Sequence, residues 1–218
     1  MFIGHFAVGF AGKKAAPGTS LAVLIGAALW PDVVWPVFVL VGWEHVRIEP
    51  GNTAVTPLAF DSYPISHSLV ADLGWATLLA VVYYAAARYR PGCVVIWIAV
   101  MSHWVLDFIS HRPDLPIVPG MQTVVGLGLW NSRVGTVVVE GGFFALAVWV
   151  YATATQARDG AGVWGLWSFV ALLLLLYAAN LFGPPPPGVT VLAWSGIACL
   201  PLFLWVWWFD RHRAVTAV

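Results

Sequence analysis

The sequence predicts an all-α polytopic membrane protein, and two features of its composition carry that prediction. Of its 218 residues, 61% are hydrophobic and 9% are charged, whereas a soluble domain has about a quarter charged residues. Several apolar runs reach or approach the roughly 18–20 residues that a helix needs to cross a bilayer. We therefore expect about six transmembrane helices. The formal net charge is zero, so nothing points to a nucleic-acid partner.

The first two apolar segments are expected to be irregular. Residues 2–11 are too few to cross a bilayer, and a glycine and two lysines that follow are expected to end the segment. We predict a short re-entrant or interfacial helix here. The next run, residues 19–43, is long enough to span but contains Pro31 and Pro36. Because proline removes a backbone donor and clashes with the preceding turn, we expect both prolines to break this helix.

Five further transmembrane helices are expected along the rest of the chain. A polar loop, residues 44–66, precedes the first of them, and Gly-, Pro- or charge-rich connections separate the others. Apolar runs of helical length between such breakers predict the spans. They cover residues 67–88, 93–112, 134–155, 163–182 and 189–209.

The charged residues divide the chain into two predicted parts. No charged residue lies between Trp164 and Phe209. We therefore expect residues 1–156 to form a transmembrane core that contains any functional site. Residues 157–218 are predicted to form a two-helix hairpin that acts as scaffold or as an oligomer or lipid contact. The oligomeric state stays open.

The basic residues also predict an orientation in the membrane. Loops on the cytoplasmic side of a membrane protein carry an excess of lysine and arginine. Seven basic residues fall on the side of the N-terminal lysines and three on the other, so both termini are expected in the cytoplasm. The two sets are Lys13, Lys14, Arg88, Arg90, Arg158, Arg211 and Arg213, against Arg47, Arg112 and Arg133.

Residues 101–116, "MSHWVLDFISHRPDLP", place three ionisable side chains in an apolar helix. His103, Asp107 and His111 recur every four residues, which puts them on one stripe of the helix. A charged side chain at the centre of a bilayer costs about 2.5–3.5 kcal/mol on insertion scales, so it needs a partner or a function. Imidazole and carboxylate are the usual ligands of zinc and of other divalent metals. We therefore predict a metal site on this helix.

Three more residues are expected to complete the ligand set. Counted at about 1.5 Å per residue from the helix ends, His67, Asp32 and His5 fall at similar depth, between the midplane and the outer side. The predicted cofactor is a divalent metal, with zinc the preferred ion.

Four further side chains are candidates for roles beside the metal. Asp72 and Glu140 are carboxylates in predicted helices, and either one could accept a proton during catalysis. Arg112 and Arg47 are expected on the outer side, where a guanidinium could hold an anionic group of a substrate.

The same residues allow two other interpretations. Histidines and carboxylates can form a polar network that locks helices together, with or without a metal. They can also form an ion or proton path, because proline-broken helices are typical of transporter sites. The inner half of the predicted bundle contains no polar steps and the halves show no repeat, which counts against a path.

Four short blocks in residues 1–125 resemble the YdjM-like family of bacterial and archaeal inner-membrane proteins. That family is generally described as membrane-bound metal-dependent hydrolases. The matching blocks, in the family's order, are Gly4–His5, Pro31–Asp32, Ser66–His67–Ser68, and Ser102–His103 with Asp107.

The chain departs from the family pattern at two places. Val34 and Trp35 stand where the pattern has a second acid and a histidine, and one histidine upstream of Ser66 is missing. If the family holds two metals, this chain holds one, or uses His111 and Asp114 as replacement ligands. The resemblance implies a metal-dependent hydrolase in a cytoplasmic membrane. With the site near the outer leaflet, the expected substrate is an ester or phosphoester carried by a membrane lipid.

Overall fold

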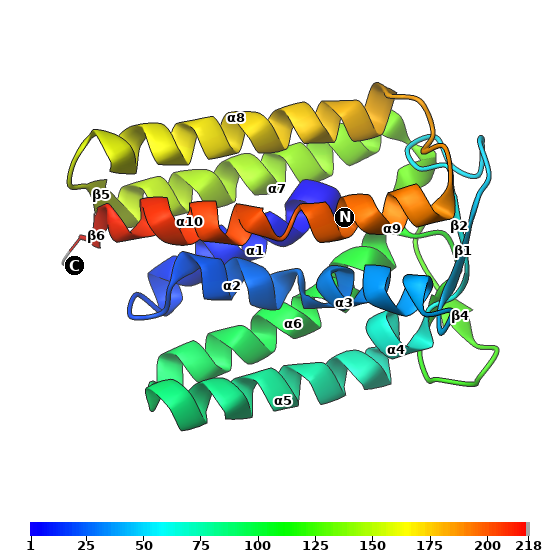
Figure 1. Ribbon diagram of the computed structural model, residues 1–218, viewed down its shortest axis with the longest axis horizontal. Coiled ribbons are helices and arrows are strands. Elements are labelled where there is room, and N and C mark those ends of the chain that lie inside the picture. The colour runs from blue at the N-terminus through cyan, green and yellow to red at the C-terminus, as the bar shows by residue number, and fades with distance from the viewer. Residues whose placement is uncertain (217–218) are drawn as a thin grey trace.

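The chain folds into a bundle of α-helices, and the computed structural model describes residues 1–216. Within residues 1–216, five helices are long and apolar enough to cross a membrane, and there are six if a bent pair of helices is taken as one span. The predicted class, an all-α polytopic membrane protein, is confirmed. The long helices run side by side along the horizontal axis of Figure 1. They are α5 (Leu69–Ala87), α6 (Arg90–Ser110), α7 (Arg133–Ala154), α8 (Gly160–Phe182), and α9 (Val189–Ala198) followed by α10 (Pro201–Arg211).

Helix α1 (Phe2–Ala15) is a short helix buried inside the bundle. It begins about halfway along the bundle and ends near one end of it (Figure 1). The prediction that Gly12 and the lysines stop this helix was wrong. The reason is that Lys13 is buried, with Nζ 2.8 Å from Asp210 Oδ2 and 2.9 Å from the Thr19 carbonyl oxygen. A paired lysine can remain inside the bundle, so the helix continues past it.

The second apolar run forms the bent pair α2 (Leu21–Ala28) and α3 (Trp30–Leu40), whose axes differ by 56°. The bend lies at Leu29, ahead of both prolines. Pro31 occupies the first turn of α3, where a missing N–H costs no helical hydrogen bond. Pro36 lies inside α3, which continues to Leu40. The expectation that both prolines break the helix was therefore wrong, although a break is present.

Other segments differ from the expected boundaries in smaller ways. The polar loop contains a two-stranded antiparallel hairpin, β1 (His45–Ile48) and β2 (Leu58–Ser62). The helix expected at 67–88 is divided at Ser68 into α4 (Pro64–His67) and α5. The remaining short elements are β3 (Leu115–Pro116) with β4 (Val124–Val125), the 3-10 helix η1 (Leu129–Asn131), and β5 (Thr155–Ala157) with β6 (Arg213–Val215).

These short strands mark the two ends of the bundle (Figure 1). We call the end with β1, β2, β3 and β4 the hairpin end. The other end carries β5, β6 and the α1–α2 and α5–α6 connections, and we call it the basic end. All seven lysines and arginines that were predicted on the side of the N-terminal lysines lie in or beside these two strands and two connections.

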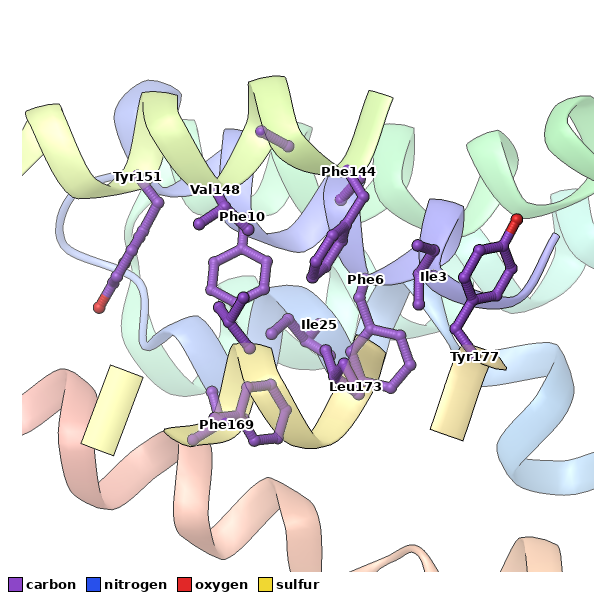
Figure 2. Packing of buried hydrophobic residues seen from close by; sticks show 14 of the residues in the cluster. Ile3, Phe6, Phe10, Ile25, Phe144, Val148, Tyr151, Phe169, Leu173 and Tyr177 are labelled. Atoms are coloured by element: carbon purple, nitrogen blue, oxygen red, sulfur yellow. The ribbon is translucent and has the colours of Figure 1, made fainter. Parts of the chain in front are cut away.

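The largest apolar core surrounds α1. Phe6 and Phe10 of α1 pack with Phe144 of α7 and Phe169 of α8, as Figure 2 shows. Phe209 of α10 belongs to the same cluster. Helices α8 and α10 therefore share one core with α1 and α7, and together they hold α1 in place.

Helices α1 and α2 cross at very close range. A Cβ atom added to Gly9 would lie 2.7 Å from Ile25 Cα and 2.8 Å from Ile25 N. Such distances are shorter than any normal contact, so only glycine fits between the two backbones.

We expect Gly9→Ala to destabilise the protein by about 1–3 kcal/mol, because the added methyl group forces α1 away from α2. Thermal unfolding in detergent measures the effect as a lower Tm. Gly74→Ala on α5 is the matched control, since a Cβ there meets no atom within 4 Å. Equal melting temperatures for both variants would contradict the close crossing.

Candidate metal centre

Helix α6 places His103 and Asp107 one turn apart on its buried face, where it packs against α1, α2 and α5. Both residues are almost fully buried, with exposures of 0% and 3%. The stripe predicted from the four-residue spacing is therefore directed into the bundle and not toward lipid.

Four histidines surround the carboxylate of Asp107. Its Oδ1 lies 3.1 Å from His5 Nε2. Its Oδ2 lies 3.3 Å from His103 Nε2, 3.8 Å from His111 Nε2 and 3.9 Å from His67 Nε2. Each histidine thus presents the same ring nitrogen to one carboxyl group.

Two neighbouring groups complete this centre. Asp32, at the start of α3, has Oδ1 3.4 Å from His67 Nε2 and 3.8 Å from His103 Nε2. The amino group of Met1 lies 2.6 Å from Asp107 Oδ1 and 2.9 Å from His5 Nε2. Nitrogen atoms of Met1 and of the histidines therefore surround the Asp107 carboxylate.

Hydrogen bonds at the opposite ring nitrogen orient three of the histidines. His103 Nδ1 lies 2.8 Å from the Ala28 carbonyl oxygen, at the C-terminal end of α2. His111 Nδ1 lies 2.9 Å from Asp114 Oδ1, and His67 Nδ1 lies 2.6 Å from Ser66 Oγ. A carbonyl or carboxylate can only accept, so Nδ1 of His103 and of His111 carries the proton. In the neutral imidazole, the Nε2 lone pair then faces the centre, which is the arrangement of metal-binding histidines.

Tyr63 supports the His111 side of the centre. Its hydroxyl lies 3.2 Å from His111 Nδ1 and donates to Asp114 Oδ1 at 3.3 Å. Burial raises the pKa of the Tyr63 hydroxyl well above its usual value. The hydroxyl therefore stays protonated and remains a donor to Asp114.

The residues present fit a metal ion. Among the described residues, His103 Nε2 is a buried atom at the centre without a hydrogen-bond partner, which is costly unless something else satisfies it. Two trios have ligand atoms within 4.8 Å of one another: His5, His103 and Asp107, and Asp32, His67 and His103. Nitrogen and carboxylate donors in such a group bind divalent transition metals. This cluster, buried except for the half-exposed Asp32, can therefore hold a metal ion.

A cavity of about 170 Å³ reaches the cluster from the hairpin end. Five of the predicted ligands line it. The ligands are His5, Asp32, His67, Asp107 and His111. His103 is fully buried and does not line the cavity.

The two predicted catalytic carboxylates lie in different surroundings. Glu140 on α7 lines the cavity, and its Oε1 accepts a hydrogen bond from Gly4 N at 3.1 Å. Asp72 on α5 is fully buried and does not line the cavity, and both of its carboxylate oxygens lack a partner among the described residues. The structure thus brings Glu140, and not Asp72, to the space where a substrate could enter.

The two arginines proposed for an anionic substrate are both engaged elsewhere. Arg47 on β1 donates to Asp61 through Nε at 2.7 Å and through Nη2 at 3.0 Å. Arg112 donates from Nε to Asp114 Oδ2 at 3.1 Å. Neither arginine lines the cavity.

Sequence reasoning missed Glu44, which is buried with 1% exposure and contacts Ser66 beside His67. Glu44 stands in a polar loop, where an acidic residue carries no signal of burial.

Comparison of the chain with protein-family models, with curated proteins and with solved structures finds no match. The resemblance to the YdjM-like family therefore rests on its four short blocks.

We expect protein purified in detergent to contain at least one divalent metal ion per chain, measured by elemental mass spectrometry. His103→Ala and Asp107→Ala should each lose the ion, because each removes a donor at the centre of the cluster. His212→Ala is the matched control, since His212 pairs with Asp159 at the basic end. A metal-free wild type with both variants folded would indicate a polar network instead.

Proposed function

We propose that this protein is a membrane-embedded metal-dependent hydrolase that acts on an ester or phosphoester carried by a membrane lipid. One observation carries the proposal. Four imidazole Nε2 atoms and two aspartates converge beside a cavity that opens at the hairpin end. A set of buried metal donors next to an accessible cavity is typical of a catalytic site rather than of a closed structural one.

The proposed ligands come from the two trios and from His111. Zinc is the preferred ion, because histidine and carboxylate are its usual ligands in hydrolases. When bound, a divalent cation supplies Lewis acidity, which polarises a carbonyl or phosphoryl oxygen and makes water a stronger acid. The residues that would hold it are His5, Asp32, His67, His103, Asp107 and His111.

Glu140 is the proposed proton acceptor. Its carboxylate lines the same cavity, and the N–H of Gly4 fixes one of its oxygens at 3.1 Å. The pair is buried on α7 and α1, so the carboxylate is held in one position beside the space for substrate. A positioned carboxylate can take a proton from water and return it to the leaving group.

The lining of the cavity supports an amphiphilic substrate. Its polar wall is formed by the histidine and aspartate cluster, and its other walls are mainly aromatic or aliphatic. These include Trp35, Val55, Leu58, Phe60 and Trp130. We propose that the reacting head of a lipid lies against the polar wall while its apolar part contacts these side chains.

The distribution of charge supports the proposed orientation. The basic end carries seven lysines and arginines, so it is proposed to face the cytoplasm. The centre then opens toward the outer leaflet, and the C-terminal strand β6 lies on the cytoplasmic side. The expectation that both termini face the cytoplasm does not fit Met1, which lies inside the bundle beside Asp107. A bacterial or archaeal cytoplasmic membrane is the location that the family resemblance implies.

The packing beside the centre favours a hydrolase over an ion path. Ile96, Ala99 and Val100 of α6 pack with Leu24 and Ala28 of α2 in a buried apolar cluster, on the basic-end side of His103. An ion that passed through the bundle would have to cross this apolar layer. The polar groups therefore form a pocket rather than a continuous path.

We expect purified wild-type protein to hydrolyse a lipid ester or phosphoester, and His103→Ala to abolish the reaction. Glu140→Gln should lower kcat by about 10²- to 10⁴-fold while the bound metal remains, because it removes only the proton acceptor. Product release from a panel of lipid esters and phosphoesters, with metal content measured in parallel, provides the test.

Asp72→Asn, assayed alongside, distinguishes the two carboxylates. A loss of kcat in Asp72→Asn with none in Glu140→Gln would assign the proton to Asp72. Ion flux in proteoliposomes that disappears with Asp32→Asn, without any hydrolysis, would contradict the hydrolase and favour a transporter.

A further inference from the structure

We propose that Glu44 and Ser66 are positioning residues that fix the ring of His67 with its Nε2 lone pair facing Asp32 and Asp107. The inference rests on the proposed metal centre and names two residues that complete it. Neither touches the cavity, and both act through His67.

The three side chains form a continuous hydrogen-bonded chain. Glu44 Oε2 lies 2.6 Å from Ser66 Oγ, and Ser66 Oγ lies 2.6 Å from His67 Nδ1. At the other side of the ring, His67 Nε2 lies 3.4 Å from Asp32 Oδ1. Glu44, Ser66 and His67 are all buried, with exposures of 1%, 0% and 4%, so water does not compete for these bonds.

The chemistry of each group fixes the direction of every hydrogen bond. Glu44 Oε1 already accepts from the backbone N–H groups of Ile65 at 2.7 Å and Ser66 at 2.8 Å. The Ser66 hydroxyl donates its single proton to the other oxygen, Glu44 Oε2. The Ser66 oxygen is then left to accept from His67 Nδ1–H. In the neutral imidazole, Nε2 of His67 then carries the lone pair and is available as a ligand.

A neighbouring serine shows that this arrangement is not a result of sequence position alone. Ser102 precedes His103 just as Ser66 precedes His67. The Ser102 hydroxyl instead donates to the Ala99 carbonyl at 2.7 Å, and His103 uses the Ala28 carbonyl. Ser66 thus contacts its histidine because Glu44 accepts the proton of its hydroxyl. The Ser102 hydroxyl donates to a backbone carbonyl instead.

Glu44 is brought to this place by the end of α3. The N–H groups of Trp43 and Glu44 both bond to the Phe38 carbonyl, at 2.9 and 3.2 Å, and turn the chain back toward α4. Burying a carboxylate without a cationic partner is unfavourable unless several donors compensate it. Here three donors do so, and one of them connects it to the metal centre.

A purely structural role would limit Glu44 to its two bonds with the backbone of α4. Two substitutions separate that role from positioning. Ser66→Ala retains both backbone bonds to Glu44 Oε1 but cuts the link to His67. In Glu44→Gln, the side-chain NH₂ donates to Ser66 Oγ, so the hydroxyl must donate to His67 Nδ1. This substitution should move the His67 proton to Nε2.

The first measurement is the tautomer of His67, by ¹⁵N NMR of metal-free protein labelled at histidine, with His67→Ala to assign the signal. We expect the Nδ1–H form in wild type and in Ser102→Ala, a mixture in Ser66→Ala and the Nε2–H form in Glu44→Gln. The wild-type pattern in all four proteins would overturn the proposal.

The second measurement is the Kd for Co²⁺ on the same proteins, followed through the visible spectrum of the bound ion. We expect Ser66→Ala and Glu44→Gln to weaken binding by about 10- to 100-fold, with Ser102→Ala unchanged and all melting temperatures close to that of wild type. Unchanged Kd values in both variants would overturn the positioning role.

The two measurements also separate this inference from the proposed function. If wild type binds no Co²⁺, the proposed hydrolase fails, while the tautomers still decide whether Glu44 and Ser66 orient His67. If wild type binds Co²⁺ and the variants keep both tautomer and Kd, only the positioning role fails.

Discussion

The burial of the Asp107 carboxylate inside an apolar bundle is the constraint on which the rest of the structure depends. A carboxylate with 3% exposure requires hydrogen-bond donors or cations on every side. Within one continuous helix, only residues about one turn away can reach the carboxylate, as His103 and His111 of α6 do. The remaining partners have to come from other segments that end or break at the same depth.

Three interruptions of the helical bundle meet this requirement. Helix α1 begins about halfway along the bundle and brings His5 to Asp107. The bend at Leu29 places Asp32 at the start of α3 and leaves the Ala28 carbonyl at the end of α2 for His103. The break between α4 and α5 presents His67 at a helix end. Irregular backbone at membrane depth thus occurs where it lines the cavity, as expected for such proteins.

A second buried polar cluster holds α1 at the basic end. Lys13 pairs with Asp210, and Asp210 also accepts from Tyr151 Oη at 2.9 Å and from the backbone N–H of Leu21 at 2.9 Å. Because α1, α2, α7 and α10 meet there, α1 is fixed at both of its ends, with the aromatic core of Figure 2 between them. The C-terminal helices therefore help to place His5, although they contribute no member of the ligand trios.

The sequence by itself determined the membrane class, the approximate spans and the stripe of His103, Asp107 and His111, because hydropathy and a four-residue spacing are local properties. Only the tertiary structure decided that α1 continues through Lys13, since its partner Asp210 lies 197 residues away. Likewise, the burial of Glu44 depends on contacts 21 and 22 residues away with Ile65 and Ser66. Long-range pairing creates these environments, and no periodicity in the chain encodes it.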